Sequence, residues 1–191
     1  RAELQRLAFE PRVLTRLIDL RKSIPVSFVG SVSRAHTSRA ELLEYLSELP
    51  EFELWGRLVH ELRDGSAIRT HYEGQAWGIT MYQTLAASKI TINQHIDIAE
   101  SHANNLRLYE ATGVGTMLIT DWKEDLHELF EPGKEVVTYR SPEECVELVR
   151  YYLEHDDERE AIARAGQART ISEHTYENRI RQLLDIVHTL S

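Results

Sequence analysis

The chain is poor in cysteine and lacks long apolar runs. Cys145 is its only cysteine, so the chain can form neither an internal disulfide nor a cluster of thiolate metal ligands. No apolar run is long enough to cross a bilayer, and no secretory signal peptide is visible. We therefore expect a protein of the reducing cytoplasm. Because the sequence begins at Arg1 rather than Met, we also expect it to have been cut from a longer protein.

Positive charge is scarce as well. Lys and Arg number 22 against 31 Asp and Glu, which gives a net charge of −9. This balance argues against a partner nucleic acid, because such binding needs a basic surface that displaces counterions from phosphates. A single phosphate-binding pocket remains compatible with it, since one arginine or a helix terminus can oppose the overall charge locally.

Short apolar runs alternate with helical patterns along most of the 191 residues. The alternation predicts a Rossmann-like, doubly wound α/β domain, in which helices cover both faces of a parallel sheet. We expect this domain at residues 25–172, after a helical segment within 1–24 that is broken at Pro11 and before a C-terminal helix at 173–191. Residues 57–76 are expected to be irregular. The predicted strands lie at residues 25–30, 52–55, 89–94, 116–120 and 135–139.

Several helix starts carry capping signals. A side-chain oxygen before the first helical residue can accept a hydrogen bond from a free backbone N–H, and a glutamate three residues later can return one. The caps predicted in this way are Ser38 with Glu41, Asn104 or Asn105, Ser141 with Pro142 and Glu144, and Asp157. His174 is expected to pack or cap at the start of the last helix rather than to take part in a site.

One candidate binding loop follows the first predicted strand. Gly30 ends that strand, Ser31 and Arg34 follow in the loop, and Arg39 is near the start of the next helix. In doubly wound sheets ligands bind at the carboxyl ends of strands, where helix N-termini attract phosphate. Glycine allows close approach, and arginine can hold a pyrophosphate. The alternative is an ordinary strand–turn–helix with solvated arginines, since one glycine is a weak signal.

A second polar loop follows the strand at 89–94. Its helix carries Glu110, and a carboxylate one turn inside a helix could accept two hydrogen bonds from the cis-diol of a ribose. In the alternative interpretation the asparagines only cap the helix and Glu110 pairs with Arg107 at the surface. The polar residues gathered here are Asn93, His95, Asn104, Asn105, Arg107 and Glu110.

Residues 104–116 (NNLRLYEATGVGT) resemble the donor-site helix of GT-B glycosyltransferases. The likeness is to the group with a C-terminal domain of the "glycosyl transferases group 1" type, which includes spore-maturation-type proteins. It extends over about residues 25–188, and several separated blocks in the same order make it specific. These further blocks are residues 28–31, 89–93, 118–121, 129–137, 162–167 and 174–176.

The resemblance implies roles for individual residues. Glu110 matches the second glutamate of a pair that holds the nucleotide ribose, whereas the position of the first glutamate is occupied by His102. Asn104 and Asn105 match the position where backbone amides meet the diphosphate. For the basic residue that neutralises the leaving phosphate, the resemblance leaves Arg34 and Arg39 open.

The resemblance further implies that the chain is the C-terminal, donor-binding half of a GT-B enzyme. Such an enzyme moves a sugar from a nucleotide diphosphate sugar to an acceptor hydroxyl without a metal or other cofactor. The acceptor site would belong to a missing N-terminal domain, toward which residues 173–191 could cross, so we expect the isolated chain to bind nucleotide weakly and to transfer nothing. A non-catalytic nucleotide-binding module and a protein-interaction module stay open as alternatives on the same fold.

Overall fold

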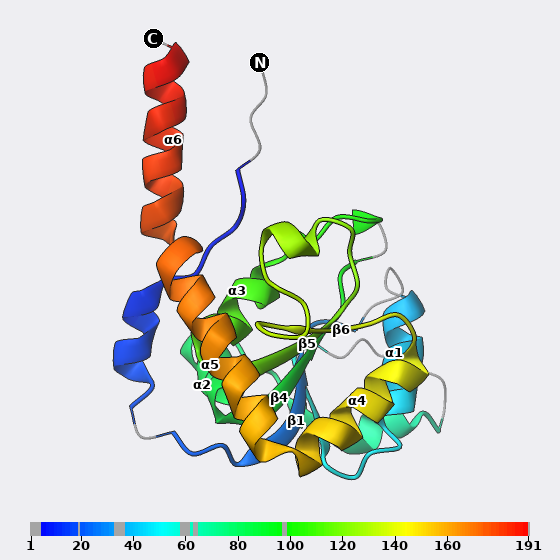
Figure 1. The fold of residues 1–191 in the computed structure, drawn as a ribbon. Coiled ribbons are helices and arrows are strands. Elements are labelled where there is room, and N and C mark those ends of the chain that lie inside the picture. Colours follow the sequence, from blue (N-terminus) through cyan, green and yellow to red (C-terminus); the bar gives the residue numbers. More distant parts are fainter. Residues whose placement is uncertain are drawn as a thin grey trace.

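Six strands pair in parallel to form the central sheet of the computed structural model (Figure 1), which describes residues 5–18, 20–32, 37–57, 62, 65–96 and 99–190. The order across the sheet is β3-β2-β1-β4-β5-β6, the order of a dinucleotide-binding doubly wound sheet. The predicted fold class is therefore confirmed. The strands are β1 (Ile24–Val29), β2 (Phe52–Trp55), β3 (Tyr72–Gly74), β4 (Ser88–Asn93), β5 (Met117–Asp121) and β6 (Val137–Tyr139).

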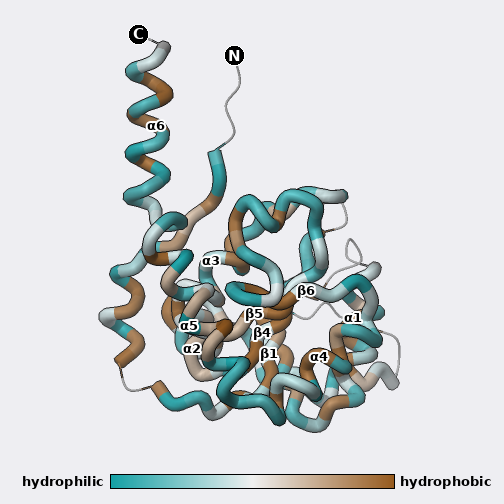
Figure 2. The backbone as a smooth tube through the Cα atoms, viewed as in Figure 1, coloured by the Kyte–Doolittle hydropathy of each residue, from teal (hydrophilic) through white to brown (hydrophobic). Residues whose placement is uncertain are grey.

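Helices pack on both faces of this sheet. On one face they enclose a core with Phe28, Met117 and Ile119, and on the other a core with Val29 and Leu118. Neighbouring residues of one strand thus point to opposite cores, as the two-residue repeat of a strand requires, and the strands form the apolar centre of Figure 2. The helices are α1 (Thr37–Leu46), α2 (Ile79–Ala87), α3 (Leu106–Gly113), α4 (Pro142–Glu154), α5 (Asp156–Glu173) and α6 (Tyr176–Leu190), with 3-10 helices η1 (Pro11–Arg16), η2 (Ala67–His71) and η4 (Leu126–Glu128).

The strand β3 was not predicted, because residues 57–76 were expected to be irregular. Its three residues carry no alternating apolar pattern, and Glu73 at its centre is exposed. The strand exists because its backbone completes the edge of the sheet, where Leu54 pairs with Tyr72 and Trp55 with Gly74. Three residues are too few for a periodic signal.

The helix predicted before Pro11 is wrong over the described residues 5–10. Phe9 instead lies extended beside Thr175, and its N–H donates to the carbonyl of His174 at 2.8 Å. Its ring is fully buried against Gly113, where a Cβ atom would lie only 2.6 Å from the ring. Pro11 begins η1 rather than breaking a helix, in agreement with the preference of proline for a first helical turn.

Two of the predicted caps are confirmed. The Asn105 side chain accepts from the N–H of Leu108, and the Ser141 side chain accepts from the N–H of Glu144. Ser38 is not an N-cap, because the described part of α1 already includes Thr37. The helix α5 begins at Asp156, one residue before the predicted cap at Asp157.

The last helix, α6, projects away from the sheet and its covering helices (Figure 1), beside the described start of the chain. It carries a stripe of half-exposed large hydrophobic side chains, namely Tyr176, Ile180, Leu183, Leu184 and Val187. Within the described residues, every helix is too short or too polar to pass through a bilayer.

Candidate functional site

A cavity of about 190 Å³ lies at the carboxyl ends of β1 and β4. The strand order reverses between these two strands, and such a switch point opens a crevice where two loops diverge. Both polar loops of the sequence reach this cavity. Six of the predicted site residues line it, namely Gly30, Arg39, Asn93, Asn104, Asn105 and Arg107.

The loop after β1 is held close to the end of β2. The N–H of Gly30 donates to the carbonyl of Trp55 at 2.9 Å. Gly56 follows with a φ of +128°, and a Cβ atom there would lie 2.2 Å from the carbonyl oxygen of Gly30. Both the positive φ angle and the close contact require glycine at position 56. Gly56 therefore allows the end of β2 to lie against the loop after β1.

Arg39, from α1, connects the loop after β1 with the loop after β4. Its guanidinium donates to the carbonyls of Ser31 at 2.8 Å and Gln94 at 2.9 Å. The residue is only 8% exposed and lies over the ring of Phe28. Ser31 itself contributes a carbonyl to this clamp and does not line the cavity. Arg34, the other candidate for holding a phosphate, lies outside the described residues.

A chain of amide hydrogen bonds fixes the start of α3. Asn93 donates from Nδ2 to the Thr120 hydroxyl at 2.9 Å and accepts at Oδ1 from Asn105 at 3.0 Å. The Oδ1 of Asn105 in turn caps the helix. This network aims the N-terminus of α3, with its free N–H groups and positive dipole, at the cavity beside the exposed Asn104.

Glu110 and Arg107 form a buried ion pair one turn into α3. The oxygen and nitrogen atoms lie 2.9 Å apart, and the side chains are 11% and 15% exposed. Burial raises the pKa of Glu110, although the charge of Arg107 and a hydrogen bond from Tyr82 oppose this. Burial likewise lowers the pKa of Arg107 against the charge of Glu110, and raises that of Tyr82 to about 12.

The pair bears on the second interpretation of Glu110. The expected pairing with Arg107 is present, but it is largely buried rather than on the surface. Arg107 lines the cavity and Glu110 does not. The ribose contact of Glu110 stays a prediction.

His95 was named among the polar residues of the second loop without a role of its own, and Asp121 was not proposed for the site. The two residues meet at the same edge of the sheet. The Oδ1 of Asp121 accepts from the backbone N–H of His95 at 2.9 Å and lies 2.7 Å from its Nδ1. Its Oδ2 pairs with Lys123 at 3.2 Å. A signal was available, because the two polar residues follow or end neighbouring strands, and the carboxyl ends of parallel strands meet at one edge.

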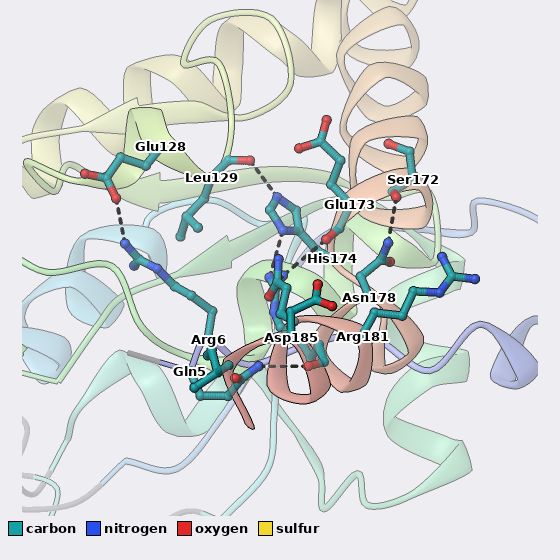
Figure 3. Close-up of a pocket in the computed structure, with 13 residues that line it drawn as sticks. Gln5, Arg6, Glu128, Leu129, Ser172, Glu173, His174, Asn178, Arg181 and Asp185 are labelled. Atoms are coloured by element: carbon teal, nitrogen blue, oxygen red, sulfur yellow. Dashed lines mark hydrogen bonds and ion pairs between the residues drawn. The ribbon is translucent and has the colours of Figure 1, made fainter. Parts of the chain in front are cut away.

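A larger hollow of about 810 Å³ lies between the N-terminal segment and α6 (Figure 3). Its polar groups bind one another. Arg6 pairs with Asp125 and Glu128, and His174 lies between the carbonyl of Leu129 and the guanidinium of Arg179. We therefore interpret this hollow as a structural contact between the N-terminal segment and α6. The packing role predicted for His174 is confirmed. Across the described ranges, no three His, Cys, Asp or Glu side chains are grouped to hold a metal ion.

A family model described as "Glycosyl transferase-like" matches residues 34–185 of the sequence, well over half of it. The chain belongs to this family. The predicted resemblance to group 1 glycosyltransferases is thereby confirmed. No curated protein has a sequence significantly similar to this glycosyl transferase-like chain.

Solved structures of glycosyltransferases share the fold of the glycosyl transferase-like chain. HepE from Anabaena, in complex with UDP-glucose, superposes with a TM-score of 0.72 at 12% identity, over 95% of this chain and 56% of its own. Sucrose-phosphate synthase from Thermosynechococcus elongatus gives 0.67 at 13% identity, over 96% and 49%. The C-terminal domain of the group 1 family protein LpcC from Francisella tularensis gives 0.57 at 10% identity, over 90% and 96%.

These identities show a shared fold and no more. The chain spans about half the length of HepE and of sucrose-phosphate synthase, and nearly all of the LpcC C-terminal domain.

Proposed function

We propose that this chain is the donor-binding half of an enzyme that moves a sugar from a nucleotide diphosphate sugar to an acceptor hydroxyl. The observation that carries the proposal is the cavity at the switch point, where a glycine loop, a helix N-terminus, the buried Arg39 and the largely buried Arg107 converge. This combination suits a diphosphate, because backbone N–H groups and arginines are its usual partners. HepE, solved with UDP-glucose on the same fold, supports it.

The proposal assigns a role in donor binding to residues in and beside the cavity. Arg39 or Arg34 neutralises the diphosphate, together with the amides at Asn104 and Asn105. Glu110 accepts hydrogen bonds from the ribose hydroxyls while it remains paired with Arg107. Gly30 and Asn93 shape the entrance at the two strand ends.

The chemistry asks mainly for stabilised negative charge on the departing diphosphate. Fixed cations and helix N–H groups in a water-poor cleft stabilise such charge without having to reorganise during the reaction. Arg39 is held by two carbonyls before any ligand arrives. We propose that arginines rather than a metal ion supply this charge.

The acceptor site would lie in an N-terminal domain of the same protein, because the chain spans only about half of HepE. The half-exposed apolar stripe of α6 supports the proposal that residues 173–191 pack against that domain. The chain alone is then expected to bind nucleotide weakly and to transfer no sugar. A cytoplasmic location stays a prediction.

Thermal unfolding of the chain with uridine, guanosine, adenosine and thymidine diphosphates tests the donor site. A ligand at about 100 times its Kd stabilises the folded state by about 2.7 kcal/mol, a shift of several degrees for a chain of this size. One diphosphate is expected to give this shift and its nucleoside alone to give far less. If none of the four shifts the unfolding, the protein-interaction alternative is favoured.

A further inference from the structure

A histidine–carboxylate pair, of which His95 lines the cavity, has no role in the proposed function. The side chain of His95 is 1% exposed, and its Nδ1 lies 2.7 Å from Asp121 Oδ1. Asp121 also binds the backbone N–H of His95 and the Nζ of Lys123. Because one carboxylate oxygen meets both the backbone N–H and the ring Nδ1 of His95, the ring has a fixed orientation and donates from Nδ1.

The other ring nitrogen has no such partner. Nε2 of His95 is buried and forms no hydrogen bond with any of the described residues. An unsatisfied buried polar atom costs about 1–3 kcal/mol, so native structures hold few of them, often at functional positions. Here the atom belongs to a side chain that lines the cavity.

Charges of both signs surround the ring. Asp121 carries a negative charge beside it, whereas Lys123, Arg39 from α1 and Arg107 from α3 carry positive charges, and the two arginines line the same cavity. Tyr139 from β6, whose pKa burial raises well above its ordinary value, stays neutral. A diphosphate in the cavity would offset the arginine charges and so favour a hydrogen-bond donor that carries positive charge.

We propose that His95 is a further donor-binding residue, whose protonated ring, held by Asp121, donates from Nε2 to the diphosphate of the nucleotide sugar. Binding of the donor then takes up a proton. The inference rests on the proposed function and adds a residue, and a pH dependence, to that site. Asp121 acts through His95 and is a positioning residue.

The pH dependence of UDP-glucose binding tests this. UDP-glucose is a suitable probe because its diphosphate is a diester that does not titrate in the range of an imidazole. We expect the chain to bind it about fivefold more tightly at about pH 6 than at about pH 8, since an imidazole loses its charge in this interval. Calorimetry in two buffers of different ionisation enthalpy should show proton uptake near neutral pH.

Two variants distinguish a binding role of His95 from a purely structural one. His95→Gln should lose most of the pH dependence, and Asp121→Asn, which keeps a hydrogen-bond acceptor, should reduce it. His188→Asn, in the last turn of α6, is the control and should keep the full ratio. Any pH effect of Glu110 persists in all three variants, so it cannot account for a loss of pH dependence in His95→Gln.

A wild-type ratio near one, or an unchanged ratio in His95→Gln, would overturn the inference and leave the proposed function standing. If His95→Gln fails to fold, the calorimetric proton uptake of the unmodified chain and of Asp121→Asn decides. Absence of binding of UDP-glucose and of the four nucleoside diphosphates at both pH values would overturn the proposed function as well.

Discussion

Replacing Glu110 with glutamine is expected to destabilise the fold, whatever Glu110 does in binding. The change leaves the charge of Arg107 in a site where the two side chains are 11% and 15% exposed. Removing one partner of a buried ion pair costs about 3–5 kcal/mol, because the remaining charge is uncompensated. At the lower end of this range the melting temperature of a chain of this length should fall by roughly 6–12 °C.

The matched control removes both charges. In the double variant Arg107→Met, Glu110→Gln an apolar side chain replaces the uncompensated cation, so the free energy of unfolding should return to within about 1 kcal/mol of the wild type. Urea unfolding followed by circular dichroism measures the four corners of the cycle. A loss below about 1 kcal/mol in Glu110→Gln would show that the pair is not buried as described, and would refute the reasoning.

The stable double variant then isolates the ribose contact. Two hydrogen bonds from the ribose to a carboxylate should favour UDP over its 2′,3′-dideoxy analogue by roughly tenfold, since bonds to charged groups are the strong ones. We expect the wild type to show this preference and the double variant to bind both ligands alike. If the preference survives in the double variant, Glu110 does not hold the ribose.

Three further predictions concern the frame of the site. Asn105→Ala should lower the free energy of unfolding by about 1 kcal/mol through loss of the α3 cap, whereas Asn104→Ala, at the exposed neighbour, should leave it nearly unchanged; urea titrations compare the two. Gly113→Ala should cost about 1–3 kcal/mol, because its Cβ would meet the ring of Phe9; Phe9→Leu in that background should cost less than it does alone. Burial would raise the pKa of Asp121, but the hydrogen bonds from His95 and the charge of Lys123 outweigh it and hold the pKa below its ordinary 3.8. The stability this gives is therefore complete above about pH 3.8 and is lost as the pH falls through the folded-state value, so acid unfolding curves should be shallower there in Asp121→Asn.

The sheet could be predicted from the sequence because its central strands carry strong local signals. β1, β2, β4 and β5 are short runs rich in apolar residues, and their predicted limits differ from the observed ones by at most about one residue. β3 has no such signal and exists only through its hydrogen bonds to β2. The extended course of residues 5–10 depends on contacts with Thr175 and His174, far away in the sequence, which no local pattern reveals.

The position of the candidate site in the fold was predictable in the same way. Parallel strands bring their carboxyl ends to one edge, so Gly30 and Asn93 could be expected to meet, and they do. What the sequence does not show is which polar groups the protein itself already binds. Arg39 is held by two carbonyls and Glu110 by Arg107, and these partners follow only from side-chain directions in the folded chain.

The size of the cavity bears on the proposal that two domains form the active site together. Pockets that enclose a small ligand usually measure about 300–1,000 Å³, whereas the cavity at the carboxyl ends of β1 and β4 measures about 190 Å³. That is room for part of a nucleotide sugar, with the remainder exposed on this side of the cleft. A second domain closing over the cavity would exclude water from the diphosphate and strengthen every charge interaction within it. Weak binding by the chain alone and tighter binding by the two-domain protein are therefore two consequences of one geometry, and comparing their affinities for UDP-glucose tests both.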